Sequence, residues 1–169
     1  MRDTLVLTII GADKAGLVES LAARIAAVGG NWEEAKMARL AGQFAGVLLI
    51  TVDTARSDEL VRSLRALEPA LQVTVRPTAA PQQPAGVHAR LEVTGNDRAG
   101  IVRDITKILT ERGANIEELE SEVGSAPMSG DQMFTVRIEL HAPSLDLADL
   151  RGRLEALAGE LMVDISVSG

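Results

Sequence analysis

One stretch of this sequence occurs twice. Gly11-Ala12-Asp13-Lys14-Ala15-Gly16-Leu17-Val18 matches Gly95-Asn96-Asp97-Arg98-Ala99-Gly100-Ile101-Val102, which lies 84 positions further along the chain. The same offset relates Gly29-Gly30-Asn31-Trp32-Glu33-Glu34 to Gly113-Ala114-Asn115-Ile116-Glu117-Glu118. Two matches in one register indicate that a whole structural unit has been duplicated. The chain is therefore predicted to fold as two copies of one small domain.

A proline-rich stretch separates the two copies. It reads Pro77-Thr78-Ala79-Ala80-Pro81-Gln82-Gln83-Pro84, and prolines remove backbone donors and favour extended chain, as in an interdomain linker. With 169 residues, of which 46% are hydrophobic, the chain is long enough for two separate cores. We predict a first domain at 1–77, a linker at 78–85 and a second domain at 86–169.

Hydrophobic periodicity predicts the elements of the first copy. Gly29-Gly30 ends the first helix, because glycine accepts the left-handed conformation of a helix C-terminus, and Ser57 is the expected N-cap of the second helix. The predicted order is a strand at 5–10, a helix at 17–28, strands at 31–40 and 44–52 around a hairpin turn at 41–42, a helix from 57 and a strand at 72–76. This βαββαβ order predicts an α+β, ferredoxin-like unit, an antiparallel sheet with both helices on one face.

The second copy repeats that order. Its predicted elements are a strand at 89–95, a helix at 101–112, strands at 115–123 and 132–141, a helix at 147–157 and a strand at 162–167. Aligning Phe44 with Phe134 places six extra residues near 124–130, so the second hairpin loop is expected to be longer.

The duplicated Gly-x-Asp-x-Ala-Gly turn is the main candidate site. It joins the first strand to the first helix and places unpaired backbone N–H groups at the positive end of a helix dipole, where an anion such as a carboxylate can bind. A purely structural interpretation is that Asp13 and Asp97 are N-caps and the glycines only turn residues. Asn31 and Asn115, at the start of the second strand, are candidate donors to a ligand or, alternatively, left-handed turn residues.

Other polar residues give no catalytic or metal-binding pattern. His88 and His141 are the only histidines, they fall in different strand-like stretches, and they are interpreted as ordinary surface or edge residues. The glutamates at 33–34, 117–118, 120 and 122 are interpreted as solvated sheet residues, since neighbours on a strand point to opposite faces. No Ser-His-Asp set, P-loop or longer dinucleotide motif is present, so we expect neither an enzyme nor a cofactor.

Composition narrows the classes of partner. The net charge of −7 and the scarcity of aromatic residues (2%) argue against direct nucleic-acid binding, because phosphates would be repelled and bases would lack stacking surfaces. The chain has no cysteine, and its first strand-like run is too short for a signal sequence or a membrane span. A cytoplasmic protein without membrane contact is expected.

The βαββαβ order, the Gly-x-Asp-x-Ala-Gly-Leu/Ile-Val turn and the Gly-x-Asn-Trp/Ile-Glu segment resemble the ACT domain, a regulatory module that usually binds amino acids. The tandem arrangement is similar to the glycine cleavage system transcriptional repressor family, which is thought to act through a partner transcription factor. The resemblance implies ACT units paired side by side, in one chain or across a homodimer, with an effector at the strand-to-helix turn. Ala15 and Ala99 stand where many ACT domains have proline, and Trp32 stands where isoleucine is usual, a change that could alter or fill the first site. The implied contacts are Ala12, Asp13, Lys14, Ala15, Gly16, Leu17 and Asn31, and in the second copy Asn96, Asp97, Arg98, Ala99, Gly100, Ile101 and Asn115.

Two functions remain open from the sequence. The first is a non-catalytic sensor of a small amino acid, glycine being one candidate, that acts on a protein partner, for which a transcription factor of glycine cleavage metabolism is one candidate. The alternative is a ligand-free ACT module for oligomerisation, or the regulatory subunit of a metabolic enzyme.

Overall fold

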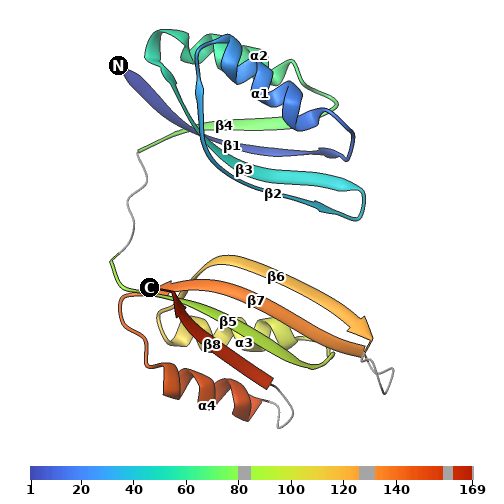
Figure 1. Cartoon of the computed structure of the whole chain (residues 1–169), viewed down its shortest axis with the longest axis vertical. Helices are drawn as coiled ribbons and strands as arrows, with labels where there is room; N and C mark the ends of the chain where they lie inside the picture. The colour runs from blue at the N-terminus through green and yellow to red at the C-terminus, as the bar shows by residue number, and fades with distance from the viewer. Residues whose placement is uncertain (80–84, 126–131, 158–161, 169) are drawn as a thin grey trace. The chain divides into compact units, whose positions relative to one another are not determined.

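The computed structural model describes residues 1–79, 85–125, 132–157 and 162–168. The chain divides into two compact units, Met1–Gln82 and Gln83–Gly169 (Figure 1). Most of the predicted linker, residues 80–84, and most of the predicted insertion, residues 126–131, lie outside the described residues.

The first unit is a four-stranded sheet with two helices on one face (Figure 1). The strand order is β2-β3-β1-β4 and every neighbouring pair is antiparallel, which confirms the predicted ferredoxin-like arrangement. Its elements are β1 (Arg2–Ala12), α1 (Leu17–Ala27), β2 (Asn31–Leu40), β3 (Gln43–Asp53), the 3-10 turn η1 (Thr54–Arg56), α2 (Ser57–Arg65) and β4 (Gln72–Thr78).

The second unit repeats this topology. Its strand order is β6-β7-β5-β8, again antiparallel throughout. The elements are β5 (Val87–Asn96), α3 (Ile101–Glu111), β6 (Asn115–Ser125), β7 (Gln132–Ala142), α4 (Leu147–Leu157) and β8 (Met162–Ser168). The predicted order of elements is therefore confirmed in both copies.

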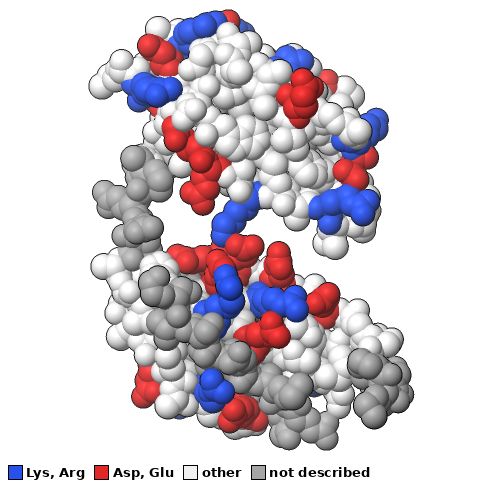
Figure 2. Space-filling model, in the orientation of Figure 1, with Lys and Arg blue, Asp and Glu red and all other residues white. Residues whose placement is uncertain are grey.

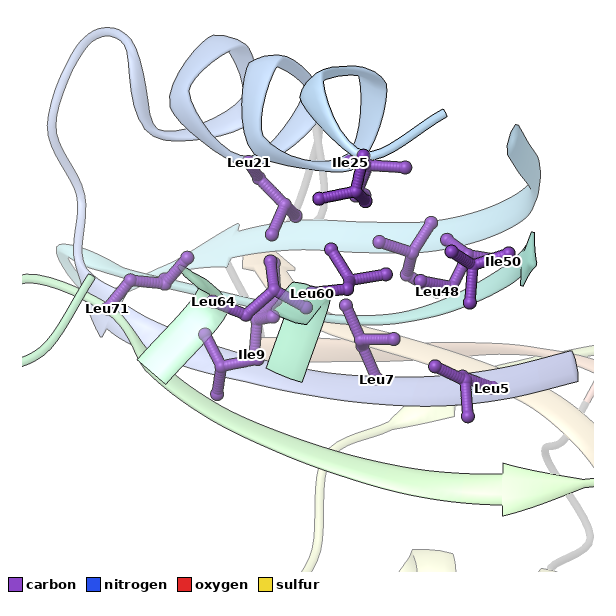
Figure 3. Packing of buried hydrophobic residues seen from close by; sticks show 13 residues of the cluster. Leu5, Leu7, Ile9, Leu21, Ile25, Leu48, Ile50, Leu60, Leu64 and Leu71 are labelled. Atoms are coloured by element: carbon purple, nitrogen blue, oxygen red, sulfur yellow. The ribbon is translucent and has the colours of Figure 1, made fainter. Parts of the chain in front are cut away.

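Each unit has its own apolar core between the sheet and its helices. In β1 the side chains of Leu5, Leu7 and Ile9 are buried, because alternate residues of a strand face the same side. The buried stripes of α1 (Leu21 and Ile25) and of α2 (Leu60 and Leu64) pack against them (Figure 3). The cores consist almost wholly of Leu, Ile and Val, as the scarcity of aromatic residues requires.

The start of α2 differs from the expectation. Ser57 is the first helical residue rather than the N-cap, because a 3-10 turn from Thr54 to Arg56 extends the helical path by three residues. The capping bond lies further upstream, where the carboxylate of Asp53 accepts a hydrogen bond from the backbone N–H of Ala55 at 3.1 Å. Asp53 therefore supplies the side-chain capping bond that was expected from Ser57.

Candidate functional site

The first turn is tied to the hairpin beside it. Ala12 ends β1 opposite Gln43, and the next backbone N–H, that of Asp13, donates to the carbonyl of Gly42 at 2.9 Å. Gly16 then adopts a left-handed conformation (φ 88°) as the N-cap of α1, and its carbonyl accepts from the N–H of Ser20 at 2.9 Å. Residues 12–16 are all exposed, so a ligand can reach this turn.

The second turn has the same construction. The N–H of Asp97 donates to the carbonyl of Gln132 at 2.9 Å, and Gly100 (φ 83°) is the N-cap of α3. The carbonyl of Gly100 accepts from the N–H of Asp104 at 3.0 Å. Residues 96–100 are exposed, whereas Ile101 is buried in the core of the second unit. The duplication thus preserves the conformation of the turn as well as its sequence.

The N-cap interpretation of the two aspartates is wrong. The caps are Gly16 and Gly100, and neither helix has a side-chain capping bond. The glycines are required by conformation and not by space: a Cβ on Gly16 would have no neighbour within 4 Å, but a positive φ is strained for other residues. Asp13 instead lies 3.5 Å from the guanidinium of Arg39 on β2.

The basic side chain of the second turn, Arg98, is already paired with a carboxylate of the protein. Arg98 forms an ion pair at 2.8 Å with Asp104, in the first turn of α3, and Arg103 contacts the same carboxylate at 2.8 Å. The hydrogen bonds from Arg98 and then Arg103 lower the pKa of Asp104. Lys14 and Ser20 stand at the equivalent positions of the first turn. A ligand carboxylate at the second turn must therefore compete with Asp104.

Asn31 and Asn115 are strand residues. They open β2 and β6 opposite Thr51 and His141, and among the described residues other than glycine only Ala41 has a positive φ, so the left-handed interpretation is wrong. The side-chain amide of Asn31 donates to Glu33 Oε1 at 3.0 Å, and Thr51 Oγ1 donates to the same oxygen at 2.7 Å. These two bonds, with a smaller contribution from the charge of Arg2, lower the pKa of Glu33.

The turn and the asparagine lie at opposite ends of the same sheet. Asn31 is level with Thr51 and Thr4, whereas the turn begins at Ala12, level with Gln43. Eight residues of extended strand separate the two levels, or about 26 Å. One unit therefore does not bring its turn and its asparagine to one small ligand.

Two features were missed from the sequence. The pairing of β2 with β3 shifts between Trp32 and Glu34, and that of β6 with β7 shifts between Ile116 and Glu118, so each copy has a β-bulge at a glutamate. The second feature is a pair of histidines: His88 and His141 are cross-strand partners with ring centroids 4.9 Å apart. His141 is buried, with 8% exposure, so interpreting it as a surface residue was wrong.

The helix-free face of the second sheet carries many charges. Arg137 contacts Glu92 at 2.9 Å and Glu122 at 3.1 Å, and Arg90 contacts Glu139 at 2.6 Å. Basic and acidic side chains lie close together on the surface of this unit (Figure 2), and a groove of about 330 Å³ runs between them. No group of three metal-ligating side chains occurs within the described ranges, and none of the helices there is long and apolar enough to cross a membrane.

The comparisons with known proteins agree with this architecture. Residues 3–78 and residues 86–159 each match the ACT domain family, so the chain belongs to the ACT-domain proteins and carries two such domains in tandem. Over 97% of its length it is 27% identical to the glycine cleavage system transcriptional repressor of Escherichia coli (strain K12), of which it covers 88%.

Two solved structures share the fold along the whole chain. A protein of Galdieria sulphuraria described only as unknown has a TM-score of 0.87 at 26% identity, with both chains fully covered. A crystal structure proposed to be of a glycine cleavage system transcriptional repressor has a TM-score of 0.72 at 17% identity, covering 99% of each chain. The ACT family comprises regulatory modules, so this chain is a regulatory protein.

Proposed function

We propose that this protein is a non-catalytic sensor of a small amino acid, with glycine as the first candidate, and that it acts on a protein partner in the cytoplasm. The observation that carries the proposal is the duplicated turn. Both copies place an exposed, left-handed glycine directly before the helix, with the same hydrogen-bonded link to the neighbouring hairpin.

The chemistry of the turn suits a carboxylate. The N–H groups of the first helical residues have no carbonyl within the helix to bind, and they stand at the positive end of its dipole. In the second turn one of them, the N–H of Ile101, already donates to the carbonyl of Arg98 at 3.3 Å. Lys14 adds a positive charge beside the first turn, whereas Arg98 at the second is shared with Asp104. The first turn is therefore the stronger candidate for the effector carboxylate.

A ligand that uses both a turn and an asparagine requires two ACT units, because the two lie at opposite ends of one sheet. We infer that a second copy of the chain supplies the missing half, so that the effector stabilises a homodimer. An effector can shift such an equilibrium only by its difference in affinity between the two states.

The similarity to a transcriptional repressor of glycine cleavage supports the choice of effector and of partner class. On this proposal the dimer with bound glycine differs from the free protein in its affinity for a transcription factor. The net charge of −7 favours this route over direct contact with DNA phosphates.

Titration calorimetry of the full chain against glycine and the other standard amino acids tests the proposal. The matched variants are Val18→Pro and Val18→Ala: Val18 is exposed in the first turn of α1, so proline removes one N–H donor without entering the core. We expect the wild type and Val18→Ala to bind, and Val18→Pro to bind about ten-fold more weakly. Binding of no amino acid by the wild type would refute the sensor function.

A further inference from the structure

The helix-free face of the first sheet is apolar at its centre. Ile10 and Val47 lie on this face with 46% and 50% exposure, and Val6 and Leu49 lie there half-buried. Each of them alternates along its strand with a buried core residue, so each points away from the helices. A group of aliphatic side chains exposed together on a sheet face is typical of an interaction surface.

The strand register places two opposite charges at the edges of this face. Val6 of β1 is paired with Leu49 of β3 on one side and with Arg76 of β4 on the other. Leu49 is paired in turn with Glu34 of β2. One row across the sheet therefore has an acid at one edge, a base at the other and two aliphatic side chains between them. Glu34 and Arg76 are both exposed, and neither is in an ion pair with another described residue.

Two copies of this row complement each other. Sheets that pack face to face with aligned strands lie about 10 Å apart, a distance that side chains from both faces fill. A two-fold axis parallel to the strands, between β1 and β3, sets β2 of one copy over β4 of the other and β3 over β1. Glu34 of each copy then lies over Arg76 of the other. In the middle of the row, Leu49 lies over Val6.

We propose that the helix-free face of the first sheet binds the same face of a second copy of this chain in this two-fold arrangement. The face has four strands of seven to eleven residues, and at about 4.8 Å between strands and about 3.4 Å per residue its area is about 600 Å². Two copies together bury about 1,200 Å², which is the lower limit for a specific and stable interface. The interface has an aliphatic centre and an ion pair at each edge.

The helix-free face of the second sheet lacks this complementarity. Its described charged side chains are Arg90 and Arg137 against Glu92, Glu118, Glu120, Glu122 and Glu139. Two faces with such an excess of acid repel each other. The contact between copies is therefore expected in the first unit and not in the second.

This contact is separate from the proposed effector sites. The turn and Asn31 lie at the two ends of the sheet, whereas the row through Val6 and Leu49 crosses it between them. The face-to-face dimer therefore forms without an effector. The effector-dependent pairing of the proposed function is a second contact, which leaves the first one in place.

Sedimentation velocity of the full chain at micromolar concentrations, without any amino acid, tests the proposal. We expect the wild type to be a dimer. Glu34→Arg sets two bases over each other and Arg76→Glu sets two acids over each other, so each variant should raise the dissociation constant at least about ten-fold. The double variant Glu34→Arg/Arg76→Glu restores opposite charges and should dimerise like the wild type. Three strand spacings, about 14 Å, separate the two side chains within one sheet, so this rescue reports a contact between copies.

Val47→Arg, with Val123→Arg as its matched control, tests the centre of the face. The strand accepts an arginine at this place, because Arg137 stands at the equivalent position of the second unit. Val123 has a similar exposure, 52% against 50%, but it is paired with the core residue Phe134 and lies on the other face of its sheet. We expect Val47→Arg to be a monomer, since it buries an unpaired charge, and Val123→Arg to remain a dimer.

Four results would overturn the face-to-face contact. They are a monomeric wild type, a dimer that forms only when glycine is added, a double charge variant that does not recover, and a dimer that survives Val47→Arg but is lost in Val123→Arg. Each of them leaves the sensor function intact, because calorimetry measures amino-acid binding separately. Far-UV circular dichroism and the Tm of each variant check that the fold is kept.

Discussion

His141 Nε2 lies 3.0 Å from the carbonyl oxygen of Ala85. Because a carbonyl can only accept, this imidazole carries its proton on Nε2 and joins β7 to the residues that lead into β5. The space beside this contact is filled: a Cβ on the neighbouring Gly86 would clash with His141 Nε2 and with the carbonyl of Ala142. The entry to the second unit is thus fixed by one buried side chain.

Replacing His141 should loosen this entry. His141→Leu removes the donor, and we expect the second unit to lose about 0.5–1.5 kcal/mol of stability. His141→Gln can still donate from a similar place and should lose less. Urea unfolding monitored by hydrogen exchange of the β5 and β7 amides measures the difference. Equal loss in the two variants would show that the ring, and not the hydrogen bond, matters.

The left-handed conformation of Gly16 gives a second prediction. Gly16→Ala should destabilise the first unit by about 1–2 kcal/mol, because the Cβ is strained at φ 88° although there is room for it. Gly16→Asn should lose less, since asparagine tolerates this conformation. Chemical denaturation of the three proteins provides the measurement, and an unaffected Gly16→Ala protein would contradict the assigned backbone conformation.

Gly152 provides the opposite case. It lies within α4 and is exposed, and a Cβ there would meet nothing within 4 Å. Gly152→Ala should therefore stabilise the second unit by about 0.5–1 kcal/mol, because alanine loses less backbone freedom in a helix. A rise in Tm checks this expectation, and a fall would mean that α4 is not a regular helix at this position.

The ion pairs of Asp104 make part of the stability depend on pH. Arg98 and Arg103 lower the pKa of this carboxyl in the folded state, so its contribution is present above the pKa of the unfolded chain and is lost as pH falls through the folded value. We expect Asp104→Asn to lower Tm at pH 7, with the gap to the wild type closing as the solution is acidified below the usual range of an aspartate. A gap of constant size between pH 7 and pH 3 would exclude this electrostatic origin.

The fold could be predicted because its signals are local and were repeated. Strand runs, helical stripes and the glycines at 29 and 42 mark the elements, and the duplication let each copy support the other. The prediction of an N-cap at Ser57 was wrong because two capping residues, Asp53 and Ser57, lie four positions apart, and the helical path begins at the earlier one.

The details of the site were harder to predict because they depend on register. A bulge at Glu33 leaves the order of residues along the strand unchanged, so only the pairing with β3 reveals it. His88 precedes the longer hairpin and His141 follows it, so the two residues have different offsets from their equivalents in the first copy. Thr4 is paired with Thr51 in the first copy. Transferring this pair to the second copy, with allowance for the six extra residues, predicts the contact between the histidines.

The helix-free faces of the two sheets have a consequence for how such a chain can change. Arg137 and Glu139 occupy the strand positions that Val47 and Leu49 hold in the first unit. Their cross-strand partners also lie at equivalent positions in the two units. The helix-free sheet face can therefore be either apolar or charged, so substitutions can change its surface chemistry without disturbing the core. The left-handed glycine of the turn cannot vary in this way, because other residues are strained at a positive φ. After duplication, new specificity is most easily acquired on the sheet face, while the turn stays fixed in both copies.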